Sequence, residues 1–197
     1  MKISPVILAS GFSRRFGTDK LMEKALGKPL IDYVIRALHE AGFAQIFAVI
    51  RKEQEELKNH AGEYLKFIEN EKAIEGQSSA IKAAVSHLRS ESDAIMFLLG
   101  DQPLIRADTI IRLCRTHISE EYGISSCQID GRLCPPVIFS SFYFDELMNL
   151  SGDTGAKPVL IRHSDRIARV SFGERYEADD VDVPQMIPVI ENFLKVT

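Results

Sequence analysis

The chain has 197 residues, of which 45% are hydrophobic and 26% are charged, a balance typical of a globular protein. Its net charge of −4 argues against non-specific binding to nucleic acid or to an anionic membrane, so we expect neither partner. The cysteine usage and the absence of a signal-like segment lead us to expect a cytoplasmic location. No apolar run approaches the roughly 20 residues that span a bilayer, and the three cysteines contain no CxxC pair, which favours free thiols.

Strand-like and helix-like segments alternate along the first part of the chain. In chain order, the patterns predict a strand at residues 3–9, a helix that begins behind Pro29 and ends near Gly42, a strand at 45–50, a charged and exposed helix at 52–60, a strand at 64–69, a helix at 78–88, a strand at 94–99 and a helix that Asp108 caps. The run at 94–99 is the most apolar, so we expect it at the centre of a sheet covered on both faces.

The pattern is less regular after residue 122. It predicts short strands at 123–129, 136–140 and 167–172, and helices at 142–150, 156–162 and 184–196. The β-α-β-α alternation that precedes them predicts an α/β protein with three layers built around a mostly parallel sheet. Because the sequence contains no internal repeat or linker, we expect residues 1–197 to form a single domain.

The segment after the first strand, ASGFSRRFGTDK, combines small residues with positive charge. Ala9, Ser10 and Gly11 allow backbone N–H groups to approach a ligand closely, and Arg15 and Lys20 add positive charge beside them. A polyphosphate requires this combination of donors and charge. The segment is neither a Walker A loop nor a GxGxxG fingerprint. The alternative is an ordinary turn between a strand and a helix, with its charges in solvent.

This segment resembles the signature LAxGxSxRxGxxK of nucleotidyltransferases that activate small phosphorylated acceptors. It is most similar to the molybdenum cofactor nucleotidyltransferases, and the resemblance extends over nearly the whole chain. The resemblance implies the Rossmann-like fold of nucleotide-diphospho-sugar transferases, with Arg15, Lys20 and Asp101 as catalytic residues. The nucleotide-binding residues that it implies are Leu8, Ala9, Ser10, Gly11, Arg15, Lys20, Gln77, Ser78, Ser79 and Asp101. For Gln77 and Ser78, helix capping is an equally good interpretation.

Two aspartates are candidate metal ligands. Asp101, in the sequence GDQP, directly follows the strand at 94–99, where α/β proteins bind ligands, and its carboxylate can hold Mg²⁺. The resemblance gives Asp101 the same role and adds Asp182, because DVDVP resembles the family's DIDTP motif; Mn²⁺ is the substitute ion. Val183 replaces the usual threonine. The alternatives are a turn at Asp101 and a helix cap at Asp182.

A second group of residues resembles the acceptor side of the family. The sequence GDTGAK is similar to the family element GDxGAR, with lysine in place of arginine, and a proline precedes an acceptor-lobe strand. A lysine keeps the charge but loses the bidentate fork of arginine. The acceptor-binding residues that the resemblance implies are Pro136, Gly152, Asp153, Gly155 and Lys157.

The resemblance implies that an acceptor phosphate oxygen attacks the α-phosphorus of a nucleoside triphosphate and that pyrophosphate leaves. Ser10 leaves less space than glycine and GDQP is typical of the cytidylyl-transferring branch, so CTP is favoured over GTP. The acceptor would be the molybdenum cofactor, and a molybdoenzyme would receive the product. The alternatives are GTP as the nucleotide, another phosphorylated small molecule as the acceptor, or a non-catalytic carrier of the cofactor.

Overall fold

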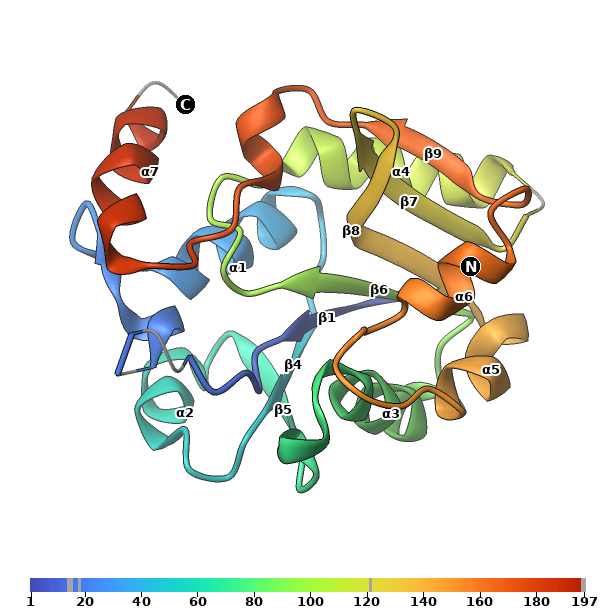
Figure 1. The fold of residues 1–197 in the computed structure, drawn as a ribbon, viewed down its shortest axis with the longest axis horizontal. Helices are drawn as coiled ribbons and strands as arrows, with labels where there is room; N and C mark the ends of the chain where they lie inside the picture. Colours follow the sequence, from blue (N-terminus) through green and yellow to red (C-terminus); the bar gives the residue numbers. More distant parts are fainter. Residues whose placement is uncertain (14–15, 18, 121, 196–197) are drawn as a thin grey trace.

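A seven-stranded sheet forms the centre of the computed structural model, which describes residues 1–13, 16–17, 19–120 and 122–195 (Figure 1). The strand order is β5-β4-β1-β6-β8-β7-β9. The strands are β1 (Ile3–Leu8), β4 (Ile46–Ile50), β5 (Leu65–Glu69), β6 (Ala94–Leu99), β7 (Ile124–Ile129), β8 (Arg132–Ser140) and β9 (Ala168–Ser171). Among the described residues β8 runs antiparallel to both of its neighbours, β6 and β7, and the other strand pairs are parallel. The prediction of a mostly parallel sheet is confirmed.

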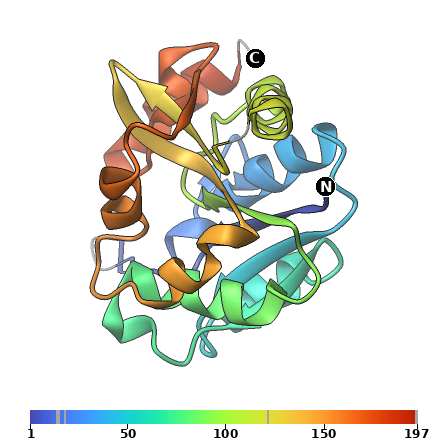
Figure 2. The same cartoon turned by 90° about the vertical axis from the view of Figure 1, so that its right-hand side faces the viewer.

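Helices cover both faces of the sheet (Figure 2). One apolar cluster joins the sheet to α1 (Leu30–Glu40), α2 (Glu55–Ala61) and α4 (Ala107–Ser119). The cluster on the opposite face contains residues of α3 (Gln77–Leu88), α5 (Phe144–Met148) and α6 (Lys157–Arg162). The central strands supply both clusters because side chains alternate between the two faces of a strand. Ile7, for example, packs in the first cluster and Val6 in the second, so the predicted three-layer architecture is confirmed.

Two helix predictions were wrong in detail. The helix predicted at 52–60 begins at Glu55, and it is not simply exposed, because Leu57 is fully buried against the sheet. Asp108 does not cap α4: the capping position is Arg106, and Asp108 lies in the first turn, where it accepts a hydrogen bond from Arg112. Glu177, from a distant part of the chain, accepts a hydrogen bond from the Arg106 N–H at this end of the helix.

The helix predicted at 184–196 is divided into two elements. A 3-10 helix spans Pro184–Met186, and α7 spans Ile187–Leu194. Pro188 explains the division, because it has no N–H with which to continue an α-helix begun at Pro184. Residues 196 and 197 lie outside the described residues.

Two hairpins were not predicted. In the first, β2 (Lys24–Ala25) and β3 (Lys28–Pro29) form a separate two-stranded sheet against which α7 packs. The second joins β7 to β8 through Asp130 and Gly131, whose φ angles are 47° and 77°. Positive φ at both central residues is typical of the tight turns that connect antiparallel strands. This turn explains why β8 begins at Arg132 and runs antiparallel to β7.

No helix in the described part of the chain is long and apolar enough to cross a membrane. Cys114, Cys127 and Cys134 are free thiols, as predicted from their number and spacing.

His117 makes the stability of the fold sensitive to acid. Its ring is 2% exposed and lies between the hydroxyls of Ser125 and Ser140, at 3.0 and 3.2 Å, and burial lowers its pKa from 6.5 to about 4. Between these two values the unfolded chain binds a proton that the folded protein excludes. The free energy of unfolding should therefore fall as the pH decreases from about 6.5 to about 4, by at most about 1.4 kcal/mol per pH unit from this group.

Urea unfolding of the wild type and of His117→Gln at several pH values measures this contribution. The difference between the two proteins isolates His117 from the other titrating groups. Parallel pH profiles for the two proteins would contradict the assignment.

Candidate functional site

A cavity of about 790 Å³ lies at the carboxyl ends of β1 and β6. In the sheet, β4 lies on one side of β1 and β6 lies on the other. The strand order therefore changes direction between β1 and β6. Open α/β sheets bind ligands at such a point. The residues that line the cavity include Leu8, Ala9, Ser10, Gly11, Phe12, Ser13, Lys20, Ala73, Ile74, Glu75, Gly76, Gln77, Leu99, Asp101, Gly152 and Asp153.

Residues 9–20, called here the first loop, bring Lys20 to an acidic group. Asp19 accepts a hydrogen bond from the Leu21 N–H and so begins a short 3-10 helix (Lys20–Met22) that carries the lysine. The Lys20 ammonium donates to Asp101 Oδ2 and lies 3.8 Å from Asp182 Oδ1. The three side chains that the sequence assigned to metal and phosphate binding are therefore together. Arg15 lies outside the described residues.

A third carboxylate belongs to the same group. The pKa of Asp180 is raised from 3.8 to about 6, mainly by burial and in addition by repulsion from Asp101 and Asp182. Its Oδ1 atom is buried and has no hydrogen-bond partner among the described residues. The N–H of Val181 donates to the Asp101 carbonyl oxygen at 3.0 Å, which fixes this segment beside β6. Three carboxylates around one lysine leave an excess of negative charge.

This excess charge and the unpartnered oxygen of Asp180 fit a divalent cation. No group of three or more His, Cys, Asp or Glu side chains within the described ranges is arranged to hold a metal alone. Mg²⁺ and Mn²⁺ bound with a nucleotide need only one or two carboxylates, because phosphate oxygens and water complete the coordination. Asp101 and Asp182 can supply these two ligands.

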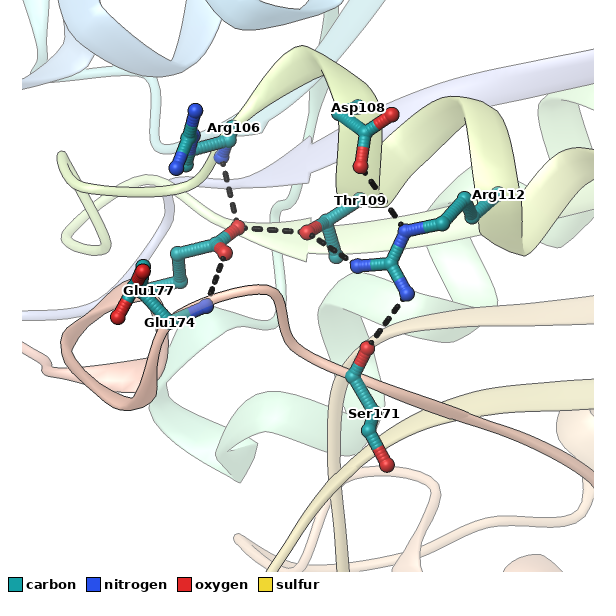
Figure 3. A network of polar contacts seen from close by, with 7 residues as sticks. All are labelled: Arg106, Asp108, Thr109, Arg112, Ser171, Glu174 and Glu177. Atoms are coloured by element: carbon teal, nitrogen blue, oxygen red, sulfur yellow. Dashed lines mark hydrogen bonds and ion pairs between the residues drawn. The ribbon is translucent and has the colours of Figure 1, made fainter.

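A buried glutamate holds the segment that carries Asp182 in place (Figure 3). Glu177 is fully buried and accepts hydrogen bonds from the Thr109 hydroxyl at 2.7 Å, the Arg106 N–H at 3.2 Å and the Glu174 N–H at 2.9 Å. Its negative charge therefore lies at the amino-terminal end of α4, where the helix dipole favours it. Through these bonds α4 anchors residues 174–178, directly before the acidic segment.

The predicted nucleotide-binding residues Gln77, Ser78 and Ser79 differ in their position relative to the cavity. Gln77 lines the cavity, but Ser78 and Ser79 are 1% and 4% exposed and do not line it. The Ser79 hydroxyl donates to the Gly76 carbonyl oxygen at 2.7 Å and accepts from Asn70, which also donates to Ser10 Oγ at 3.1 Å. Ser79 therefore supports the cavity wall from behind, through a buried polar group that includes Ser10.

The acceptor-side loop packs against the start of α3. Asp153 accepts a hydrogen bond from the Gln77 N–H at 2.9 Å, and the Ser78 N–H donates to the Gly152 carbonyl oxygen at 3.2 Å. Gly76 has a φ of 92°, and a Cβ atom at that position would lie 2.8 Å from the Asp153 Cα atom. A glycine is therefore required at 76 for this close approach.

A second cavity, of about 460 Å³, adjoins the first and shares Leu8, Gln77 and Leu99 with it. Its lining is mostly apolar, with Lys157 and Arg132 as its two cationic residues. Of the other predicted acceptor residues, Gly152 and Asp153 line the first cavity, Gly155 lies against the side chain of Gln77, and Pro136 lines neither cavity, although Pro135 lines the second.

Sequence reasoning missed three polar residues around the first loop: Arg51, Gln54 and Asn70. Arg51 and Gln54 donate hydrogen bonds to carbonyl oxygens of the loop, and Asn70 donates to Ser10. All three follow the carboxyl ends of β4 and β5. That position was the available signal, because ligands of parallel sheets bind at this edge.

Comparisons with known proteins agree with this architecture. A family model described as MobA-like NTP transferase domain matches residues 5–167. The chain is 36% identical over 120 residues to the bifunctional protein GlmU of Syntrophomonas wolfei; the match covers 59% of this chain and 26% of GlmU. The chain thus spans about a quarter of the length of that curated relative.

Solved structures share the fold over almost their whole length. A nucleotidyl transferase from Methanothermobacter superimposes with a TM-score of 0.84 at 19% identity, covering 100% of this chain and 99% of the other. The structure of CMP:2-keto-3-deoxy-manno-octonic acid synthetase complexed with CTP gives a TM-score of 0.78 at 15% identity, with coverage of 100% and 99%. The predicted Rossmann-like nucleotide-diphospho-sugar transferase fold is confirmed.

Replacing Glu177 by glutamine should destabilise the protein while keeping the side-chain volume. A glutamine oxygen can accept from Thr109, but its NH₂ group would then face the Glu174 N–H, which loses its buried acceptor. We expect the free energy of unfolding to fall by about 1–3 kcal/mol, measured by urea denaturation. Glu53→Gln, at an exposed position, is the matched control. Equal losses in both variants would refute the anchoring role of Glu177.

Proposed function

The chain belongs to the family of MobA-like NTP transferase domains, and from this premise we propose that it transfers CMP from CTP to the phosphate of the molybdenum cofactor. The reaction depends on Mg²⁺ and releases pyrophosphate. One observation carries the proposal: Lys20, Asp101 and the small residues of the first loop meet in one cavity, and a second cavity adjoins it.

The triphosphate would bind to the first loop. The backbone of Ser10 and Gly11 borders the cavity, and Lys20 provides a positive charge at its edge. Arg15 belongs to the same loop and would add a second charge. These groups neutralise the β- and γ-phosphates and stabilise the pyrophosphate as it leaves. The acceptor phosphate then needs correct placement more than a strong base.

Asp101 and Asp182 would hold the metal ion. Bound Mg²⁺ polarises the α-phosphate and neutralises its charge. Lys20 contacts both carboxylates in the protein alone and is the group that would turn towards the phosphates when the nucleotide binds. Asp180 contributes negative charge beside the two ligands and draws a cation to this place.

The base would lie between the start of the first loop and the turn before α3. Ser10 is 7% exposed, and its hydroxyl accepts a hydrogen bond from Asn70, so a fixed side chain occupies space that glycine would leave open. This smaller space favours a pyrimidine. The solved synthetase complex named above holds CTP in the same fold, which is consistent with this choice.

The second cavity supports a large acceptor with an anionic group. Phe97, Val137, Phe139 and Leu160 give it an apolar wall that suits a fused heterocycle better than a sugar, whose hydroxyls need polar partners. Lys157 and Arg132 supply positive charge for a phosphate. A molybdoenzyme would then receive the cytosine dinucleotide form of the cofactor.

Pyrophosphate release with CTP, GTP, ATP or UTP tests the proposal, in the presence of Mg²⁺ and the molybdenum cofactor. We expect release with CTP, and a loss on the order of 10²-fold or more in Asp101→Asn, since that variant lacks a metal-binding charge. Replacing the cofactor by sugar phosphates should abolish release.

The possible results separate the parts of the proposal. A preference for GTP would keep the chemistry and overturn the choice of base. Turnover with a sugar phosphate would overturn the choice of acceptor. Delivery of active molybdoenzyme by Asp101→Asn at the wild-type rate would overturn catalysis itself and favour a carrier.

A further inference from the structure

Two side chains outside the cavity hold the backbone of the first loop from behind. Arg51 follows β4, and its guanidinium group donates to the carbonyl oxygens of Ser10, at 2.9 Å, and Gly11. Gln54, at the start of α2, is 4% exposed and donates through Nε2 to the Ala9 carbonyl oxygen at 3.0 Å. Three successive carbonyl groups of the loop are thus bound on one side.

The two side chains also hold each other and the far end of the loop. The Arg51 N–H donates to Gln54 Oε1 at 2.8 Å, which orients the amide of Gln54. The same Nε2 atom of Gln54 donates to Asp19 Oδ2 at 2.6 Å. Asp19 in turn begins the 3-10 helix that carries Lys20. Arg51 and Gln54, called here the loop clamp, therefore connect the start of the loop to its lysine.

The clamp determines the direction of the loop's donors. In a trans peptide the C=O and the N–H of one unit point in opposite directions. Because the carbonyl groups of Ala9 and Ser10 face the clamp, the N–H groups of Ser10 and Gly11 face away from it, and both residues border the first cavity. Successive N–H groups that point to one place form a binding site for an anion.

We infer that the loop clamp is a positioning device that aims the first-loop amides and Lys20 at the pyrophosphate part of the nucleotide. The inference rests on the proposed function and extends it to two residues that do not touch the substrate. Its specific consequence is selectivity: the clamp supports binding of the β- and γ-phosphates much more than binding of the base, ribose and α-phosphate.

Two conservative variants separate aiming from charge and from packing. Arg51→Lys keeps the positive charge, but a single ammonium cannot reproduce the fork that reaches two carbonyl oxygens. Gln54→Met keeps the side-chain volume and removes the hydrogen bonds to Ala9 and Asp19. Arg115→Lys, at an exposed position of α4, is the matched control for the first substitution.

Calorimetric titration with magnesium pyrophosphate, CTP and CMP measures the selectivity. Both clamp variants should bind pyrophosphate and CTP about ten- to hundred-fold more weakly than the wild type, and CMP within about twofold of it, because charged hydrogen bonds of the loop are misdirected. The control should match the wild type with every ligand. GTP and GMP are titrated in parallel, so that an error in the choice of base does not affect the result.

Thermal unfolding of each variant identifies a protein that has lost its fold. If Gln54→Met does not fold, Arg51→Lys still tests the clamp, because it leaves the buried amide of Gln54 in place. Equal weakening of CMP and CTP would overturn the inference, since it would indicate general distortion of the cavity. Wild-type affinity for pyrophosphate in both variants would overturn the clamp alone. Absence of pyrophosphate and triphosphate binding in the wild type would overturn the proposed function together with the clamp.

Discussion

The parallel pairing of β1 with β6 is the constraint on which the site depends. The two strands are in register to their last residues, Leu8 and Leu99, so the segments that follow them begin side by side. This register lets Lys20 reach Asp101 although 81 positions separate them in the chain. The hydrogen bond from Val181 to Asp101 then brings a third segment to the same edge. A single pair of strands therefore gathers Lys20 and the acidic residues from distant parts of the sequence.

One lysine and three carboxylates lie together at this edge of the sheet. Lys20 contacts Asp101 and lies near Asp182, while the half-buried Asp180 is held close to both carboxylates at a cost that its raised pKa reflects. A protein keeps such an arrangement stable only with supporting contacts elsewhere. Glu177 and the start of α4 supply these contacts behind the acidic segment, and Arg51 and Gln54 supply them behind the first loop.

The sequence was sufficient for the features that depend on local pattern. The apolar run at 94–99 predicted the central strand, which the structure confirms. The phosphate site predicted from the small and basic residues of the first loop stays a prediction. The strand at 136–140 was predicted, but its start at Arg132 and its hairpin with β7 were missed, although Asp130–Gly131 is a strong hairpin signal. Glu177 could not have been predicted, because its role as the cap of α4 arises from a contact 71 positions away in the chain. The hydrogen bond between Asp153 and the start of α3 could not have been predicted for the same reason, because 76 positions separate Asp153 from Gln77.

The wall shared by the two cavities, formed by Leu8, Gln77 and Leu99, has a consequence for the evolution of the fold. Most residues of the apolar cavity belong to β8, α6 and their neighbours, whereas the first cavity is lined mainly by the first loop and the turn before α3. Mutations can therefore accumulate in one compartment while the other stays intact.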